Sequence, residues 1–322
     1  MSSITMGRPV RILTVSFTGR AADCTPENPY PIRSLDEMVG YLKQAAVVDG
    51  HDMIVLPEFW PGASTIEDLD GPVITTMRSL AAEYRTYLIC PISRKTERVP
   101  KLNTAVLIGR DGSIVGLYDK LYPYWGEYDI APAPKAGSEL PVFDLDFGRT
   151  AIAICFDANF PHIWEEYGRR GVDVVFWPSA YSAGCQLQAH AINNNYYIVS
   201  ATTAGTCLVY DINGDRICYE SAPEVNVTRV TLDLDRGIYH NDFNLEVLST
   251  FLEQHADEVE LERCMELESW FILRSRVQGV HVRELARAAG LKELQVYKFE
   301  SRARIDHYRE HGAFSEKAGE TL

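Results

Sequence analysis

The chain has 322 residues, of which 46% are hydrophobic and 24% charged, and 45 acidic against 31 basic residues give a formal net charge of −14. This length and composition are typical of a globular protein with a large core. The acidic balance argues against nucleic acid or an anionic membrane surface as the main partner, and no run of about 20 apolar residues predicts a membrane span.

The predicted elements alternate between strands and helices along the first two-thirds of the chain. The first nine residues, MSSITMGRP, lack the apolar segment of a signal peptide, so we expect no leader. Short β-branched segments predict strands at residues 10–17, 53–56, 87–92, 103–108, 114–118, 141–145, 150–154, 172–176, 197–201, 206–210 and 225–232. Helical spacing predicts helices at residues 34–48, 73–84, 161–170 and 186–194. Crossover and hairpin connections together indicate an α/β layered fold with mixed sheets.

The character of the sequence changes after about residue 240. Residues 244–268 are acidic and predicted to be helical, and after residues 270–280 further helices are predicted at 282–290 and 293–307. We expect no strand here and too few apolar residues for a separate core. The predicted domains are therefore 8–240 and 241–322, the second being a helical C-terminal extension that packs on the first domain or across a dimer interface.

The cysteines are irregularly spaced, at Cys24, Cys90, Cys155, Cys185, Cys207, Cys218 and Cys264. There is no CxxC pair, and a chain of this size does not need disulfides to be stable. We interpret most of them as buried, reduced thiols of a cytoplasmic protein. Cys155 requires a different explanation.

Three segments each place a reactive side chain at the end of a predicted strand. LPEFW ends in Glu58, which is either a solvated loop carboxylate or a partly desolvated general base. LYDKLYPYWGE contains Lys120 and, seven residues later, Glu127; the ammonium is either solvated or directed at an oxyanion. ICFDANFP presents Cys155 before a predicted helix, whose N-terminus favours a thiolate; alone it would be read as a buried thiol.

In this order and spacing, the three segments resemble the nitrilase (carbon–nitrogen hydrolase) superfamily. The segment GVDVVFWPSA at residues 171–180 adds to the resemblance, which covers roughly residues 10–235. The resemblance implies a four-layer α-β-β-α sandwich. It also implies that Glu58 is the general base, that Cys155 is the nucleophile, and that Lys120 with the backbone N–H of Phe156 stabilises the oxyanion. Glu127 matches the family's second glutamate, which mainly orients the site.

The resemblance implies no metal or organic cofactor, and the sequence has no paired metal-ligand spacing. Nitrile-cleaving members tend to carry Trp-Glu after the cysteine, whereas this chain has Phe156-Asp157, which favours a small-molecule amide or N-carbamoyl substrate over a nitrile. Residues predicted to contact the substrate are Trp60, Tyr124, Phe156 and Tyr181, although such aromatics belong equally well to the core or to an interface. Family members generally pair, so we expect a homodimer or a higher homo-oligomer.

Two rival functions come from other classes. Residues 282–304 resemble a helix-turn-helix unit, which would make the tail a DNA-binding module. The alternative is a surface helix ended by a glycine cap, and the near balance of acidic and basic residues there weakens the DNA reading. A scaffold without turnover is the third possibility, against which the intact set of Glu58, Lys120, Glu127 and Cys155 argues.

Overall fold

The computed structural model describes residues 6–17, 34–47, 50–62 and 65–312. Cys24 and the predicted end of the first helix at residue 48 lie outside these ranges. The chain forms two compact units, one of Pro9–Leu234 and one of Met1–Arg8 with Asp235–Leu322.

The first sheet of the larger unit has the order β13-β1-β2-β4-β5-β6, with β3 paired to β4. Its central strands are parallel and its outer strands antiparallel. The bounds are β1 Pro9–Phe17, β2 Met53–Val55, β3 Ile66–Glu67, β4 Tyr87–Arg94, β5 Leu102–Ile108, β6 Ile114–Asp119 and β13 Val225–Asp233.

The second sheet has the order β12-β11-β10-β9-β8-β7 and is also mixed. The bounds are β7 Val142–Leu145, β8 Gly148–Ile152, β9 Val174–Ser179, β10 Tyr197–Thr202, β11 Thr206–Tyr210 and β12 Arg216–Ser221. The two sheets face each other, and hydrogen bonds join them where the Thr202 N–H donates to Ser16 Oγ at 3.1 Å and the Tyr197 hydroxyl donates to the Asp233 carbonyl at 2.9 Å.

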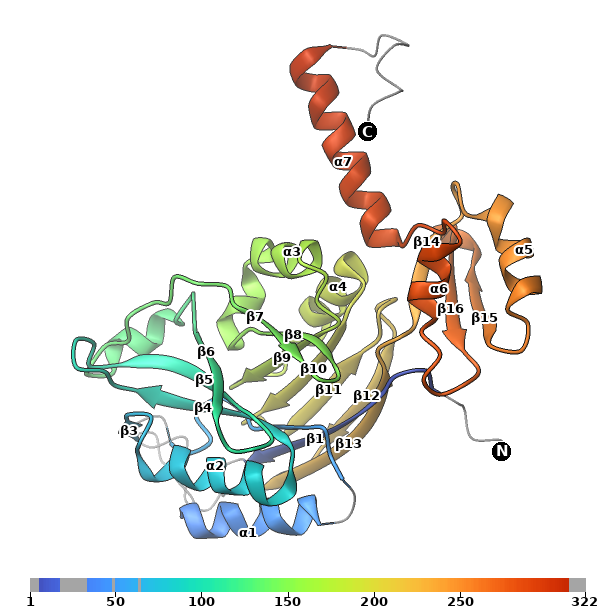
Figure 1. The fold of residues 1–322 in the computed structure, drawn as a ribbon. Helices are drawn as coiled ribbons and strands as arrows, with labels where there is room; N and C mark the ends of the chain where they lie inside the picture. Colours follow the sequence, from blue (N-terminus) through green and yellow to red (C-terminus); the bar gives the residue numbers. More distant parts are fainter. Residues whose placement is uncertain (1–5, 18–33, 48–49, 63–64, 313–322) are drawn as a thin grey trace. The chain divides into compact units, whose positions relative to one another are not determined.

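Helices cover the outer face of each sheet (Figure 1). On the first sheet lie α1 Leu35–Ala46, which begins where Ser34 Oγ accepts the Glu37 N–H, and α2 Pro72–Tyr84, which begins with proline. On the second sheet lie α3 Pro161–Arg169 and α4 Gly184–Asn194. Each helix pair buries apolar side chains against its sheet, so the described part of the larger unit has a core on the outer face of each sheet. The expected four-layer sandwich is confirmed.

The C-terminal unit differs from the all-helical extension that the sequence suggested. A three-stranded antiparallel sheet of order β14-β16-β15 accompanies its helices. Its elements are β14 Gly237–His240, α5 Leu245–Gln254, β15 Val259–Met265, β16 Trp270–Ser275, α6 Val282–Ala288 and α7 Leu294–His311. The prediction of one helix over 244–268 is therefore wrong beyond Gln254.

The physical reason lies in the residue pattern of the two missed strands. Residues 259–265 alternate between more and less buried positions with charged side chains between them, and residues 270–275 are apolar and mostly buried. The unit also has its own core, which includes Phe251, Phe271, Leu273 and Val282, so the expectation that it could not form one is wrong as well. The described helices include none long and apolar enough to cross a bilayer.

Candidate active site

Glu58 lies just beyond the carboxyl end of β2 and is fully buried. The Leu56 N–H donates to the Ile89 carbonyl at 3.1 Å, which extends the strand pairing past Val55. Phe59 then adopts a left-handed backbone with φ of 58°, a conformation that is unfavourable for a side chain of this size. This sharp turn directly after Glu58 ends the strand and leaves the carboxylate at the sheet edge.

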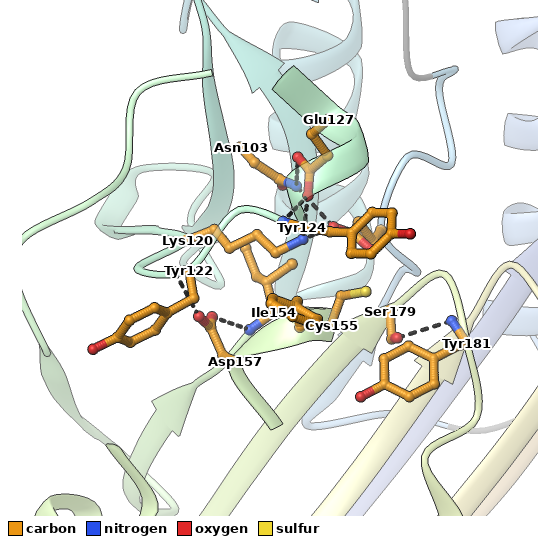
Figure 2. A network of polar contacts seen from close by, with 12 residues as sticks. Asn103, Lys120, Tyr122, Tyr124, Glu127, Ile154, Cys155, Asp157, Ser179 and Tyr181 are labelled. Carbon is orange, nitrogen blue, oxygen red and sulfur yellow. Dashed lines mark hydrogen bonds and ion pairs between the residues drawn. The ribbon is translucent and has the colours of Figure 1, made fainter. Parts of the chain in front are cut away.

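Lys120 follows β6, and its ammonium lies between the carboxylates of Glu58 and Glu127, the second of which is labelled beside it in Figure 2. Its Nζ is 2.8 Å from Glu58 Oε1 and 2.6 Å from Glu127 Oε1, and its side chain is 1% exposed. Glu127 is held in turn by the Tyr124 N–H, which donates to its Oε1 at 2.9 Å, within the short 3-10 helix Trp125–Asp129. Burial by itself lowers the pKa of Lys120, but Glu58, Cys155 and Glu127 together hold that pKa above its usual value, so the ammonium stays charged.

Asn103 completes this cluster and was not identified from the sequence. It lies on β5 with 2% of its surface exposed, and its Nδ2 donates to Glu58 Oε1 at 2.7 Å and to Glu127 Oε2 at 3.3 Å. The only sequence signal is the polar pair Asn103-Thr104 near the start of a strand that is otherwise apolar. The contacts of Asn103 and Lys120 make the two oxygens of Glu58 different. Glu58 Oε1 accepts hydrogen bonds from both residues, whereas the buried Oε2 has no partner among the described residues.

Cys155 lies beyond β8, at the start of the 3-10 helix Cys155–Asn159. Its φ of 47° is in the left-handed region, so the nucleophile candidate occupies a strained elbow. The Trp177 indole N–H donates to the Cys155 carbonyl at 3.1 Å and fixes this elbow to β9. Strain at a reactive side chain is expected where the surrounding fold imposes one orientation.

The protonation state of Cys155 differs from the sequence expectation. Burial, and then the negative charge of Glu58, raise the pKa of the thiol well above its usual range, although Lys120 acts in the opposite direction. The expectation of a thiolate at a helix start therefore does not hold for the resting site, because the α-helix begins only at Pro161 and the residue Cys155 is only 7% exposed. The resting thiol is therefore protonated, and its attack requires a base. Glu58 Oε2, which has no partner among the described residues, can act as this base.

Asp157 joins the elbow to the loop after β6. Its Oδ2 accepts hydrogen bonds from the Tyr118 hydroxyl at 2.7 Å and the Ile154 N–H at 2.9 Å, and its Oδ1 accepts the Tyr122 N–H at 2.9 Å. The side chain is fully buried, and this burial raises the pKa of Asp157 to about 6 even though the hydrogen bonds act to lower it. Asp157 therefore connects the strand end that carries Cys155 to the one that carries Lys120.

The four predicted substrate-contacting residues occupy different surroundings. Trp60 is 3% exposed in the core of the first sheet, with its ring 6.1 Å from that of Phe17, which favours its core interpretation. Tyr124 is 47% exposed and packs edge-on against Phe156, with ring centroids 5.5 Å apart. Tyr181 is half-buried, and its N–H donates to Ser179 Oγ at 3.0 Å, close to Cys155 in Figure 2. These three side chains remain candidates for substrate contact.

The comparisons with known proteins identify the family of the chain. The family model described as "Carbon-nitrogen hydrolase" matches residues 33–298. The chain belongs to the carbon-nitrogen hydrolase family. Within the described residues no group of three His, Cys, Asp or Glu side chains could hold a metal ion.

Two curated relatives and one solved structure show the range of similar proteins. The chain is 30% identical over 145 residues to a probable nitrilase of Schizosaccharomyces pombe, covering 42% of this chain and 52% of the relative. It is 30% identical over 184 residues to the beta-ureidopropionase of Arabidopsis thaliana, covering 50% and 45%. The chain thus spans about half the length of these relatives.

An amidase from Nesterenkonia sp. AN1 has the same fold, with a TM-score of 0.60 at 18% identity over 73% of this chain and 94% of that one. In that structure the acetamide moiety of fluoroacetamide is covalently added at the active-site cysteine. At this identity the likeness bears on the fold alone.

Proposed function

We propose that the protein is a cysteine-dependent hydrolase that cleaves a non-peptide C–N bond of a small amide or N-carbamoyl compound. The observation that carries this proposal is the asymmetry of Glu58, whose Oε1 is saturated by Lys120 and Asn103 while its buried Oε2 has no partner among the described residues. A carboxylate held in this way by one oxygen has the other oxygen available to accept a proton.

In the first half-reaction, Glu58 Oε2 takes the thiol proton as Cys155 Sγ attacks the carbonyl carbon. Negative charge develops on the carbonyl oxygen in this step. Lys120 carries three ammonium hydrogens, of which Glu58 and Glu127 accept two, so the third is available for the oxyanion together with the Phe156 N–H. Collapse of the intermediate expels ammonia or an amine, which takes the proton from Glu58 and leaves a thioester on Cys155.

In the second half-reaction, Glu58 takes a proton from water, which attacks the thioester carbon. The same oxyanion donors act again, and the proton returns to Cys155 as the acid leaves. One carboxylate thus serves both steps. Glu127 stays bound to Lys120, Asn103 and the Tyr124 N–H throughout, so its role in this scheme is to orient the ammonium.

An amide or N-carbamoyl substrate is preferred over a nitrile because Phe156-Asp157 follows the nucleophile. The Asp157 side chain is wholly engaged in holding the elbow through three hydrogen bonds, so it is not available to the substrate. The names of similar proteins include an amidase and a beta-ureidopropionase as well as a probable nitrilase. Nitrile hydrolysis is therefore the alternative to test.

The test is ammonia release from a panel of matched amides, N-carbamoyl compounds and nitriles. We expect release from the first two classes to exceed release from nitriles of the same chain length. Intact-mass measurement on wild-type protein quenched during turnover should then detect an adduct of the substrate's acyl group on Cys155, and Glu58→Gln should form no adduct and lose turnover almost completely, since it lacks the base for both steps. Faster turnover of nitriles across the panel would contradict the amide preference, and turnover by Cys155→Ala would contradict the nucleophile.

We also propose that the protein acts as a homodimer or larger homo-oligomer in the cytoplasm. The C-terminal unit exposes large apolar side chains, with Phe243 at 75%, Leu245 at 55% and Leu267 at 97%. All six cysteines in the described ranges are free, as suits a reducing compartment. Light scattering at micromolar concentration should give at least twice the 36.2 kDa chain mass, and a monodisperse monomer would contradict the proposal.

A further inference from the structure

Lys101 is a second buried lysine beside the site that the proposed mechanism does not use. The residue is 2% exposed, yet its ammonium makes no ion pair or side-chain hydrogen bond with any residue in the described part of the chain. Burial lowers the pKa of Lys101, and the charge of Glu127 opposes that shift. Removing an ammonium from water without an ion-pair partner is unfavourable, and an anion bound beside Lys101 would offset that cost.

The backbone shows which way Lys101 faces. The Lys101 carbonyl accepts the Lys135 N–H at 2.9 Å, and the Asn103 carbonyl accepts the Lys120 N–H at 2.8 Å. The carbonyls of residues 101 and 103 therefore point to the same neighbouring side, as they do at alternate positions of an extended strand. Side chains at such positions share one face of the sheet. Lys101 thus projects from the face that presents Asn103 to Glu58 and Glu127.

The charge balance of the site agrees with an anionic substrate. Glu58 and Glu127 carry two negative charges against the one positive charge of Lys120. This net negative cluster by itself would repel a substrate carboxylate. Lys101 supplies the additional positive charge, and it lies two residues, or about 7 Å, along the strand from Asn103.

We propose that Lys101 binds a carboxylate of the substrate, so that the preferred substrates are amides and N-carbamoyl compounds with a carboxylate a few bonds from the reacting carbonyl. This inference rests on the proposed function, because the reacting carbonyl is placed at Cys155. It deepens that function by assigning a substrate class: short dicarboxylic acid monoamides and N-carbamoyl amino acids. The ammonium would donate a charge-assisted hydrogen bond to the carboxylate.

Two isosteric substrate pairs test the assignment. Succinamate is compared with isohexanamide, and N-carbamoyl-β-alanine with isopentylurea, since in each pair the carboxylate is replaced by an isopropyl group of similar shape. We expect the protein to prefer the anionic member. Lys101→Met should lower kcat/KM for the anionic members by about 10- to 100-fold, mainly through KM, and leave the neutral members within about 3-fold. Lys101→Arg is the matched control that keeps the charge.

A binding measurement separates this inference from the proposed function. Calorimetry with succinamate is carried out on Cys155→Ala and on Cys155→Ala combined with Lys101→Met, with melting temperatures to verify folding. Lys101-dependent binding supports the subsite even if no substrate is turned over, in which case only the proposed function fails. Equal binding by the two variants, or equal losses on anionic and neutral substrates, overturns the subsite and leaves the hydrolase proposal intact.

Discussion

The two sheets contribute different things to the site. From the first sheet come the charged and hydrogen-bonding groups Glu58, Asn103 and Lys120, which are joined to one another by side-chain contacts of 2.7 to 2.8 Å. From the second sheet comes Cys155, whose position depends on backbone geometry: a φ of 47° and an indole N–H on its carbonyl. One side of the site is organised by electrostatics and the other by the shape of the chain.

This difference indicates where each kind of substitution acts. On the first-sheet side, removal of one partner leaves buried charge unsatisfied, which affects both turnover and stability. On the second-sheet side, removal of the sulfur leaves the elbow itself intact, because Asp157 and Trp177 hold it through backbone atoms. The comparison therefore predicts separate patterns of loss for the two halves.

Cys155→Ala should have the largest effect, which is complete loss of turnover with a nearly unchanged melting temperature. The Asp157 and Trp177 hydrogen bonds hold the elbow through its backbone, and alanine fits the space of the cysteine side chain. Ammonia release and thermal unfolding measure the two properties. Cys185→Ala is the matched control, since Cys185 is an exposed free thiol on α4 and should be silent in both assays. A large fall in melting temperature for Cys155→Ala would contradict the separation of the two halves.

Lys120→Met should lower turnover by about 10²–10³-fold, because an oxyanion donor is lost. Unlike Cys155→Ala, it should also destabilise the fold by about 3–5 kcal/mol, since Glu58 and Glu127 are left as buried carboxylates without their cation. Steady-state kinetics and urea unfolding test both parts. Unchanged stability with reduced turnover would show that the cluster tolerates loss of its charge partner.

The sequence predicted the ends of strands better than the contacts between them. Four site residues could be identified because each lies in a motif after an apolar strand: Glu58, Lys120, Glu127 and Cys155. In the structure Lys120 makes hydrogen bonds to both glutamates, whereas Cys155 interacts with Glu58 and Lys120 through their charges. Asn103 was missed because one polar residue in a strand gives no sign of its partners. The raised pKa of Cys155 was missed because burial is a property of the assembled layers.

The C-terminal unit was harder still to predict. In β15, acidic and basic residues separate the apolar ones, a pattern that a short helix face can share. Its burial depends on β16 and on α5, which lie elsewhere in the sequence. Local pattern alone could not distinguish a half-buried strand from a solvated helix there.

Asn103→Leu should reduce turnover by about 10- to 100-fold, the scale of a lost hydrogen bond to a charged group. Leucine has a similar size but donates nothing, so Glu58 Oε1 keeps only Lys120 and the carboxylate can rotate. The loss should fall on kcat rather than KM if Asn103 only positions the base. Asn103→Gln, which retains the donor on a longer side chain, should recover part of the rate, whereas a purely packing role would make leucine the milder change.

Asp157→Asn should have the smallest effect on turnover, and its signature is in stability as a function of pH. Burial raises the pKa of Asp157 from 3.8 to about 6, so in this range the folded protein holds a proton that the unfolded chain has released. The stability contributed by this group is therefore fully present below about pH 4 and is lost as the pH rises to about 6. This difference in pKa between the unfolded and the folded protein corresponds to about 3 kcal/mol in the free energy of unfolding.

Asparagine does not titrate, so the difference in unfolding free energy between the two proteins isolates this one group. As the pH rises across that range, the unfolding free energy of the wild type should fall by about 3 kcal/mol relative to that of Asp157→Asn. A constant difference between the two proteins adds to this change. This constant difference arises because the asparagine amide faces one of the three donors that Asp157 accepts. Urea unfolding of both proteins from about pH 4.5 to about pH 7 covers most of the transition. If the difference in unfolding free energy between the two proteins does not change with pH, Asp157 stays ionised in the folded protein. Its hydrogen bonds to Tyr118, Ile154 and Tyr122 would then outweigh the effect of burial on its pKa, and the link between the sheets would carry a full negative charge.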